Sequence, residues 1–222
     1  MAFYQQLQDQ TEQARNAMLS SVVIEQSAQG NVTRDMYIAF LSQAFYHVSH
    51  TVPLLMSAGS RLPAEKEWLR AALAEYIEEE YGHHEWILND IRACGGDAEA
   101  VRNGAPGRAI ELMLAYLYYR IERVNPLCIF GMVHVLEGTS VNIATPIAES
   151  LQHALKLPEE ATTYLRSHGA LDLEHLKFFA SLMDKVTDAR DQQDIVHTAN
   201  VVYALYGDML RALAEVPDGT AQ

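Results

Sequence analysis

Apolar side chains recur every three or four residues along almost the whole chain, whereas few stretches alternate as a β-strand would. Such spacing predicts amphipathic α-helices. Pro63 opens one helical segment and the glycines at 95 and 96 end it. Pro53 lies inside another segment and predicts a kink near that residue. The expected helices span residues 2–22, 34–59, 63–94, 108–124, 127–155, 159–186 and 188–216.

These segments predict an all-α bundle of about seven helices. The 222 residues contain no internal repeat, no low-complexity tract and no linker long enough to separate two domains. We therefore expect one domain over residues 1–222, large enough to bury a substantial core. Phosphate-binding loops, dinucleotide-binding glycine patterns and the serine-hydrolase elbow are absent from the sequence.

The charge balance restricts the partners of the chain. The formal net charge is −13, which disfavours nucleic acid as a ligand because phosphate backbones attract clustered lysine and arginine. No charge-free apolar run reaches the length of a membrane span, and the N-terminus has no signal-peptide pattern. We expect a cytoplasmic protein that binds neither nucleic acid nor membrane, with Cys94 and Cys128 as free thiols.

The stretch "RSHGALDLEHLKFF", residues 166–179, carries three polar residues at helical spacing. At about 100° per residue, Asp172 lies roughly 40° from His168 around a helix, and His175 lies roughly 20° away on the other side. Glu174 lies on another face. Apolar residues flank the stripe, so we expect it to face inward, where buried polar groups need partners. A metal ion supplies such partners at once; three aligned polar groups without a metal are the alternative.

Two other segments carry carboxylates and imidazoles at matching spacing. Glu80 lies three residues before His83 and four before His84, and His134 lies three before Glu137. Both spacings place the two side chains on one helix face. Facing helices of a bundle can bring such groups together in its core as a metal site. Carboxylate and imidazole ligands suit iron or manganese.

Further residues are candidates for a substrate cavity. His47 and His50 lie in an apolar setting and could line a cavity, and one of them could instead bind haem. His134 and Tyr81 are further candidates, although core packing is the common role of a tyrosine.

Taken together, these residues resemble the haem-oxygenase-like di-iron oxidases, in the wider group that includes the TenA thiaminases, the pyrroloquinoline-quinone synthase C (PqqC) proteins and the chlamydial protein associating with death domains. The most specific shared pattern is His-x-x-x-Asp-x-x-His on a late helix, which is His168, Asp172 and His175 here. Glu137, 31 residues before His168, fits the family's upstream glutamate, and Glu80 with His83 fits its early pair.

The resemblance implies a haem-oxygenase-like bundle that holds two iron ions, the second one weakly, or manganese in their place. The implied ligands are Glu80, His83, Glu137, His168, Asp172 and His175, with Glu79 and His84 as alternates for the early pair. It further implies an oxidoreductase that uses O₂ on a small organic substrate, and a homodimer.

Other functions of the same fold remain open. A metal-independent TenA- or PqqC-like enzyme is one, and the TenA chemistry would need a nucleophile such as Cys128. A haem-binding protein with an axial histidine such as His47 is another. A non-enzymatic interaction module is the third.

Overall fold

The computed structural model describes residues 2–216, and within them the side chains of residues 141–142 and 168–175 lie outside the description. The described chain is helical and contains no strand, which confirms the expected all-α fold. Its α-helices are α1 (Phe3–Leu19), α2 (Val22–Ala28), α3 (Arg34–Val48), α4 (Thr51–Arg61), α5 (Glu67–Glu80), α6 (His83–Ala93), α7 (Ala98–Arg102), α8 (Arg108–Tyr119), α9 (Ile129–Leu155), α10 (Thr163–Met183) and α11 (Ala189–Leu213).

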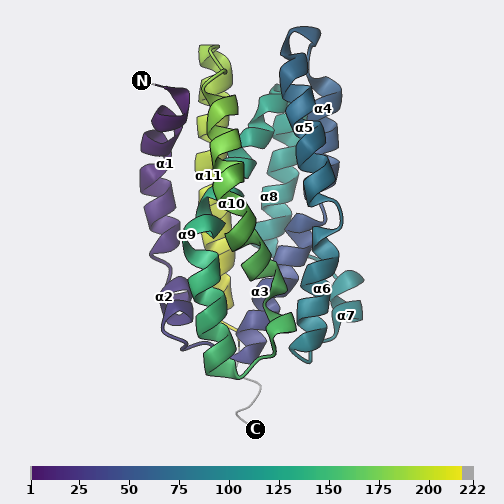
Figure 1. Cartoon of the computed structure of the whole chain (residues 1–222), viewed down its shortest axis with the longest axis vertical. Helices are drawn as coiled ribbons and strands as arrows, with labels where there is room; N and C mark the ends of the chain where they lie inside the picture. Colours follow the sequence, from purple (N-terminus) through teal and green to yellow (C-terminus); the bar gives the residue numbers. More distant parts are fainter. Residues whose placement is uncertain (1, 217–222) are drawn as a thin grey trace.

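The long helices run side by side along the longest axis of the molecule, with α9, α10 and α11 at its centre (Figure 1). Helix α9 packs against both α10 and α11, and α1 packs against α11. Helices α4 and α5 lie toward one end of the bundle, whereas α2, α3, α6 and α7 lie toward the other end (Figure 1). Apolar side chains of these helices form two buried clusters, one of which involves α3, α6, the C-terminal half of α9 and the start of α10.

The structure has more helices than the sequence predicted, because two expected helices are broken and two short ones were missed. The segment 34–59 breaks at Ser49 and His50, not at Pro53. Pro53 is the third residue of α4, where a helix needs no backbone donor, so the proline starts a helix and does not kink one. Helices α2 and α7 are the short ones, of 7 and 5 residues.

The second break separates α5 from α6 within the segment 63–94. Tyr81 has an extended backbone and Gly82 has φ +93°, a left-handed value that residues with a side chain rarely adopt. Helix α5 therefore ends at Glu80, and α6 begins at His83. The prediction of one continuous helix over residues 63–94 is therefore wrong, because a glycine in the left-handed region ends the helical hydrogen-bond pattern.

No single helix in the described part of the chain is long and apolar enough to cross a membrane; one bent pair, Pro126–Ser140 with Ile143–Leu155, passes on length and composition alone.

Helices α9 and α11 pack closely against each other at Gly131. A methyl group added at this glycine would lie 2.8 Å from the backbone nitrogen of Ala199 and 2.8 Å from the carbonyl oxygen of Ile195. Real carbon atoms do not approach backbone atoms this closely, so only glycine permits this packing.

We predict that Gly131→Ala lowers the free energy of unfolding by about 1 to 3 kcal/mol, because the two helix backbones must move apart. Gly138→Ala in the same helix is the matched control, since a methyl group there meets no atom of the described side chains or backbone within 4 Å. It should raise stability by about 0.5 to 1 kcal/mol, because alanine loses less backbone entropy than glycine in a helix. Urea denaturation measures the free energy of unfolding of both variants. An equal change in that free energy at the two glycines would contradict the close packing at Gly131.

Candidate metal centre and apolar cavity

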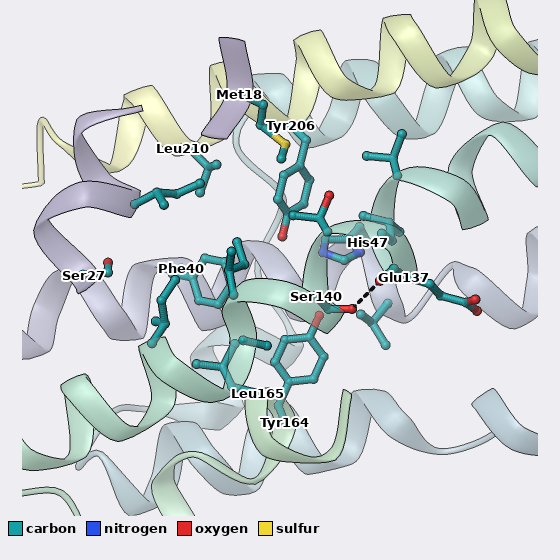
Figure 2. Close-up of a pocket in the computed structure, with 18 of the residues that line it drawn as sticks. Met18, Ser27, Phe40, His47, Glu137, Ser140, Tyr164, Leu165, Tyr206 and Leu210 are labelled. Carbon is teal, nitrogen blue, oxygen red and sulfur yellow. Dashed lines mark hydrogen bonds between the residues drawn. The ribbon is translucent and has the colours of Figure 1, made fainter. Parts of the chain in front are cut away.

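A cavity of about 150 Å³ lies inside the bundle. Its walls come from several helices and are largely apolar, with Val23 and Ile24 from α2, Phe40 from α3 and Leu210 from α11 among them. In Figure 2, His47 and Glu137 lie toward one side of this cavity, and Ser27 and Leu210 toward the other. The cavity can therefore hold an organic molecule with an apolar body.

Carboxylates gather around Tyr76 at the polar end of the cavity. Tyr76, Glu80 and Glu137 all line it, the first two from α5 and the third from α9. Burial raises the pKa of Tyr76 far above its ordinary value, and the negative charges of Glu137, Glu79 and Glu80 raise the pKa further. Carboxylates from α5 and α9 thus lie near the phenol of Tyr76, which stays protonated at neutral pH.

The break between α5 and α6 creates a buried acid–imidazole pair. An Oε2 atom of Glu80 lies 3.3 Å from Nδ1 of His83, and only 14 % and 6 % of the two side chains are exposed, respectively. The His83 ring also stacks on Trp86, with 4.1 Å between the ring centroids. A carboxylate and an imidazole are thus held next to each other inside the protein, as a metal site requires.

The alternates for this pair lie nearer the surface. Glu79 is exposed, whereas Glu80 is mostly buried. The side chain of His84 is 36 % exposed, and its Nε2 lies 3.4 Å from an oxygen of the partly exposed Glu85. The geometry therefore favours Glu80 and His83 over Glu79 and His84.

Glu137 is the third described candidate ligand. Its side chain is partly buried on α9, and its Oε2 atom is shielded from solvent. The hydroxyl of Ser140 donates a hydrogen bond of 2.9 Å to the Glu137 carbonyl oxygen, drawn as the dashed line in Figure 2. Glu137 lines the cavity together with Tyr76 and Glu80, and so belongs to its polar end.

The predicted stripe His168, Asp172 and His175 belongs to α10, but its side chains lie outside the described residues. Among the side chains that the structure describes, no three His, Cys, Asp or Glu residues come close enough to hold a metal ion. The six-ligand centre consequently stays a prediction. The described donors, carboxylates and an imidazole, are of the type that binds iron or manganese.

His47 is the one expected cavity histidine that lines the cavity. It is buried on α3, and its ring lies 5.6 Å from that of Tyr206, another lining residue. His50 does not line the cavity, because it lies in the break between α3 and α4 and its Nδ1 contacts the Tyr118 hydroxyl at 2.9 Å.

Tyr81 and His134 also lie elsewhere than expected. Tyr81 is 78 % exposed, since the extended backbone at the end of α5 turns it outward. His134 is buried in the core between α1, α9 and α11, where its Nε2 lies 3.1 Å from the Thr11 hydroxyl and its ring contacts Tyr203. Neither residue is part of the cavity wall.

Cys94 and Cys128 are both buried free thiols, as predicted. Burial raises the pKa of Cys128 above its ordinary value, so the thiol resists ionisation. Cys128 is also absent from the described cavity wall. These features disfavour it as a nucleophile.

Several cavity residues were missed by the sequence analysis. Tyr76, Thr139, Tyr164 and Tyr206 are polar examples in the described wall. The spacing of Tyr76 four residues before Glu80 could have identified it, because such residues share a helix face. No local pattern identifies the others, because their position depends on how distant helices pack.

A family described as iron-containing redox enzymes matches residues 38–207. No curated protein sequence matches the chain.

Solved structures show the same fold. A domain from Shewanella denitrificans with a haem oxygenase-like fold is 21 % identical with a TM-score of 0.84, covering 96 % of this chain and 92 % of that one. A TenA homologue from Pseudomonas syringae is 12 % identical, with a TM-score of 0.81 and coverage of 97 % and 93 %. The haem oxygenase of Leptospira interrogans is 16 % identical, with a TM-score of 0.75 and coverage of 96 % and 100 %. The expected haem-oxygenase-like fold is thereby confirmed.

The buried His134 predicts a pH dependence of stability. Burial, with a smaller contribution from Arg15, lowers the pKa of His134 to about 4. The unfolded chain binds a proton at this histidine near its ordinary pKa, about 6.5. As the pH falls from about 6.5 to about 4, the unfolded state therefore binds a proton that the folded state does not, and the free energy of unfolding falls.

We expect His134→Gln to remove this part of the pH dependence, measured by urea denaturation of chelator-treated protein. His153→Gln removes an exposed histidine and serves as the control. If the free energy of unfolding of His134→Gln depends on pH as steeply as that of the wild type, His134 is not the source of this dependence.

Proposed function

Because the chain belongs to the family of iron-containing redox enzymes, we propose that it is a di-iron oxidoreductase that uses O₂ to oxidise a small organic substrate. Iron could be replaced by manganese in one or both positions, since both metals accept the same ligands. When bound, the metal pair would supply O₂ activation. The protein's own residues bind the ions, bind and orient the substrate, and exclude water.

The observation that carries this proposal is the buried Glu80–His83 pair, which lies beside an apolar cavity that Glu80 and Glu137 line. An ordinary buried ion pair needs no cavity next to it. Here the donors stand at one end of a space that can admit a substrate. That arrangement is expected of a site where a metal meets an organic molecule.

The ions would be held by ligands from four helices. Glu80 of α5, His83 of α6 and Glu137 of α9 would provide one part of the site. His168, Asp172 and His175 of α10, which packs against α9, would provide the other. Three carboxylates would offset most of the charge of two divalent ions, and neutral imidazoles would fix the geometry without adding charge.

The cavity wall favours a substrate with an apolar body. No Lys or Arg lines the cavity in the described chain, and the undescribed residues 141–142 and 168–175 contain none. Apolar walls exclude water from the reacting end and strengthen electrostatic interactions there. Tyr76, whose raised pKa keeps it neutral, can donate a hydrogen bond at this end.

Substrate and O₂ are thus the proposed small-molecule partners. A homodimer, the absence of nucleic-acid and membrane partners and a cytoplasmic location stay predictions. Haem binding is the alternative that the fold allows, with His47 as the cavity histidine.

We predict that His83→Ala weakens ferrous-iron binding at least tenfold, because it removes a ligand. His84→Ala, one residue away and at the surface, should bind iron as the wild type does. Glu80→Gln should likewise weaken iron binding, whereas Glu79→Gln should not. Anaerobic titration with ferrous iron measures the affinity of each variant, and O₂ uptake is then recorded on the same samples.

Equal iron affinity in His83→Ala and the wild type would contradict the site. A wild type that binds no iron but gives a Soret band with haem would replace the proposal with the haem alternative.

We also predict that Ser27→Phe reduces binding of apolar ligands. Ser27 is a buried residue of α2 in the cavity wall, so a larger side chain fills part of the space. Glu25→Phe adds the same ring at an exposed position of α2 and should bind normally. Displacement of an apolar fluorescent probe from metal-free protein gives the affinities; an unchanged affinity in Ser27→Phe would show that the probe binds elsewhere.

A further inference from the structure

A buried carboxylate on α6 caps the N-terminus of α10. Asp90 is 0 % exposed, and its Oδ2 atom accepts a hydrogen bond of 2.8 Å from the backbone N–H of Tyr164. The hydroxyl and backbone N–H of Thr163 also stabilise its negative charge. Burial nevertheless raises the pKa of Asp90 to about 6, so this carboxylate occupies an unfavourable place for a charge.

Helix α10 has no cap of its own. The residue at its N-cap position, Thr162, makes no side-chain cap bond. Its hydroxyl instead donates to the carbonyl oxygen of Glu159 at 3.3 Å and accepts from Nε of Arg166 at 3.1 Å. Helix α11, in contrast, is capped by its own Asp188, which accepts bonds from the backbone of Arg190 and Asp191.

The cap bond lies close to the proposed ligands on both helices. Asp90 follows His83 by seven residues, which is within about 20° of two full helical turns, so the two share a face of α6. Tyr164 precedes His168 by four residues, about one turn of α10. The bond therefore joins the helix that begins with His83 to the helix that carries the predicted stripe.

We infer that Asp90 is a positioning residue: by capping α10 from α6, it fixes the relative position of these two helices and of the metal ligands that they carry. A cap supplied by α10 itself would stabilise that helix equally well, but it would leave its position relative to α6 to side-chain packing alone. The negative charge also interacts favourably with the N-terminal end of the α10 dipole. This inference rests on the proposed metal site.

The test compares Asp90→Ala and Asp90→Asn with Asp188→Ala, which removes a cap from a helix without proposed ligands. Anaerobic ferrous-iron titration measures affinity, and amide hydrogen exchange of the metal-free protein measures the opening of the first turn of α10. Asp90→Ala should lose about 10- to 100-fold in iron affinity and exchange faster at Tyr164. Asp90→Asn keeps an oxygen acceptor and should recover most of the affinity. Asp188→Ala should lower the melting temperature without changing the iron affinity.

Iron affinity unchanged in Asp90→Ala, with faster exchange at Tyr164, would make the cap purely structural and overturn the inference while leaving the metal site intact. Iron affinity lowered equally by Asp188→Ala would overturn it as well. A wild type without iron binding would overturn the proposed function itself. If Asp90→Ala does not fold, Asp90→Asn is compared with Asp188→Asn. A few-fold loss of iron affinity in Asp90→Asn alone supports the inference, whereas equal iron affinities in the two variants reject it.

Discussion

The site depends on a single break in the chain, at the left-handed Gly82 between α5 and α6. The break ends α5 at a buried glutamate, starts α6 at a buried histidine and turns the intervening Tyr81 toward solvent. A continuous helix would carry both groups on its side, at a spacing fixed by helical geometry. With the helix broken, Glu80 lies beside His83 and also lines the cavity that Glu137 of α9 lines.

Polar and apolar surfaces are kept apart in this molecule. Carboxylates cluster around the phenol of Tyr76, while the rest of the cavity wall consists mainly of aliphatic and aromatic groups. Because apolar walls lower the local dielectric, the charges at the polar end act strongly on each other. Divalent cations held at this end would offset the negative charge of these carboxylates, as the proposed iron centre requires.

Helical periodicity was sufficient to predict the fold class and the long helices α8 to α11, because both depend on local spacing. The family resemblance rested instead on a motif, the His-x-x-x-Asp-x-x-His pattern with its upstream glutamates. Periodicity failed where a helix breaks without a strong local signal: Gly82 is a single glycine in a helical pattern, and Pro53 pointed to a kink although it starts α4. The Glu80–His83 pair could be predicted from spacing, whereas the exposed Tyr81 and the core position of His134 could not. The cap that Asp90 provides joins residues 74 apart in the chain, which no local pattern reveals.

Helix α2, with 7 residues, contributes Val23, Ile24 and Ser27 to the cavity wall and none of the proposed metal ligands. The long helices, by contrast, are tied to each other by features such as the backbone contact at Gly131. Substitutions in α2 can therefore reshape the binding space without disturbing the reactive end. Exchange of this short element would change which molecules the cavity admits and leave the proposed metal ligands in place.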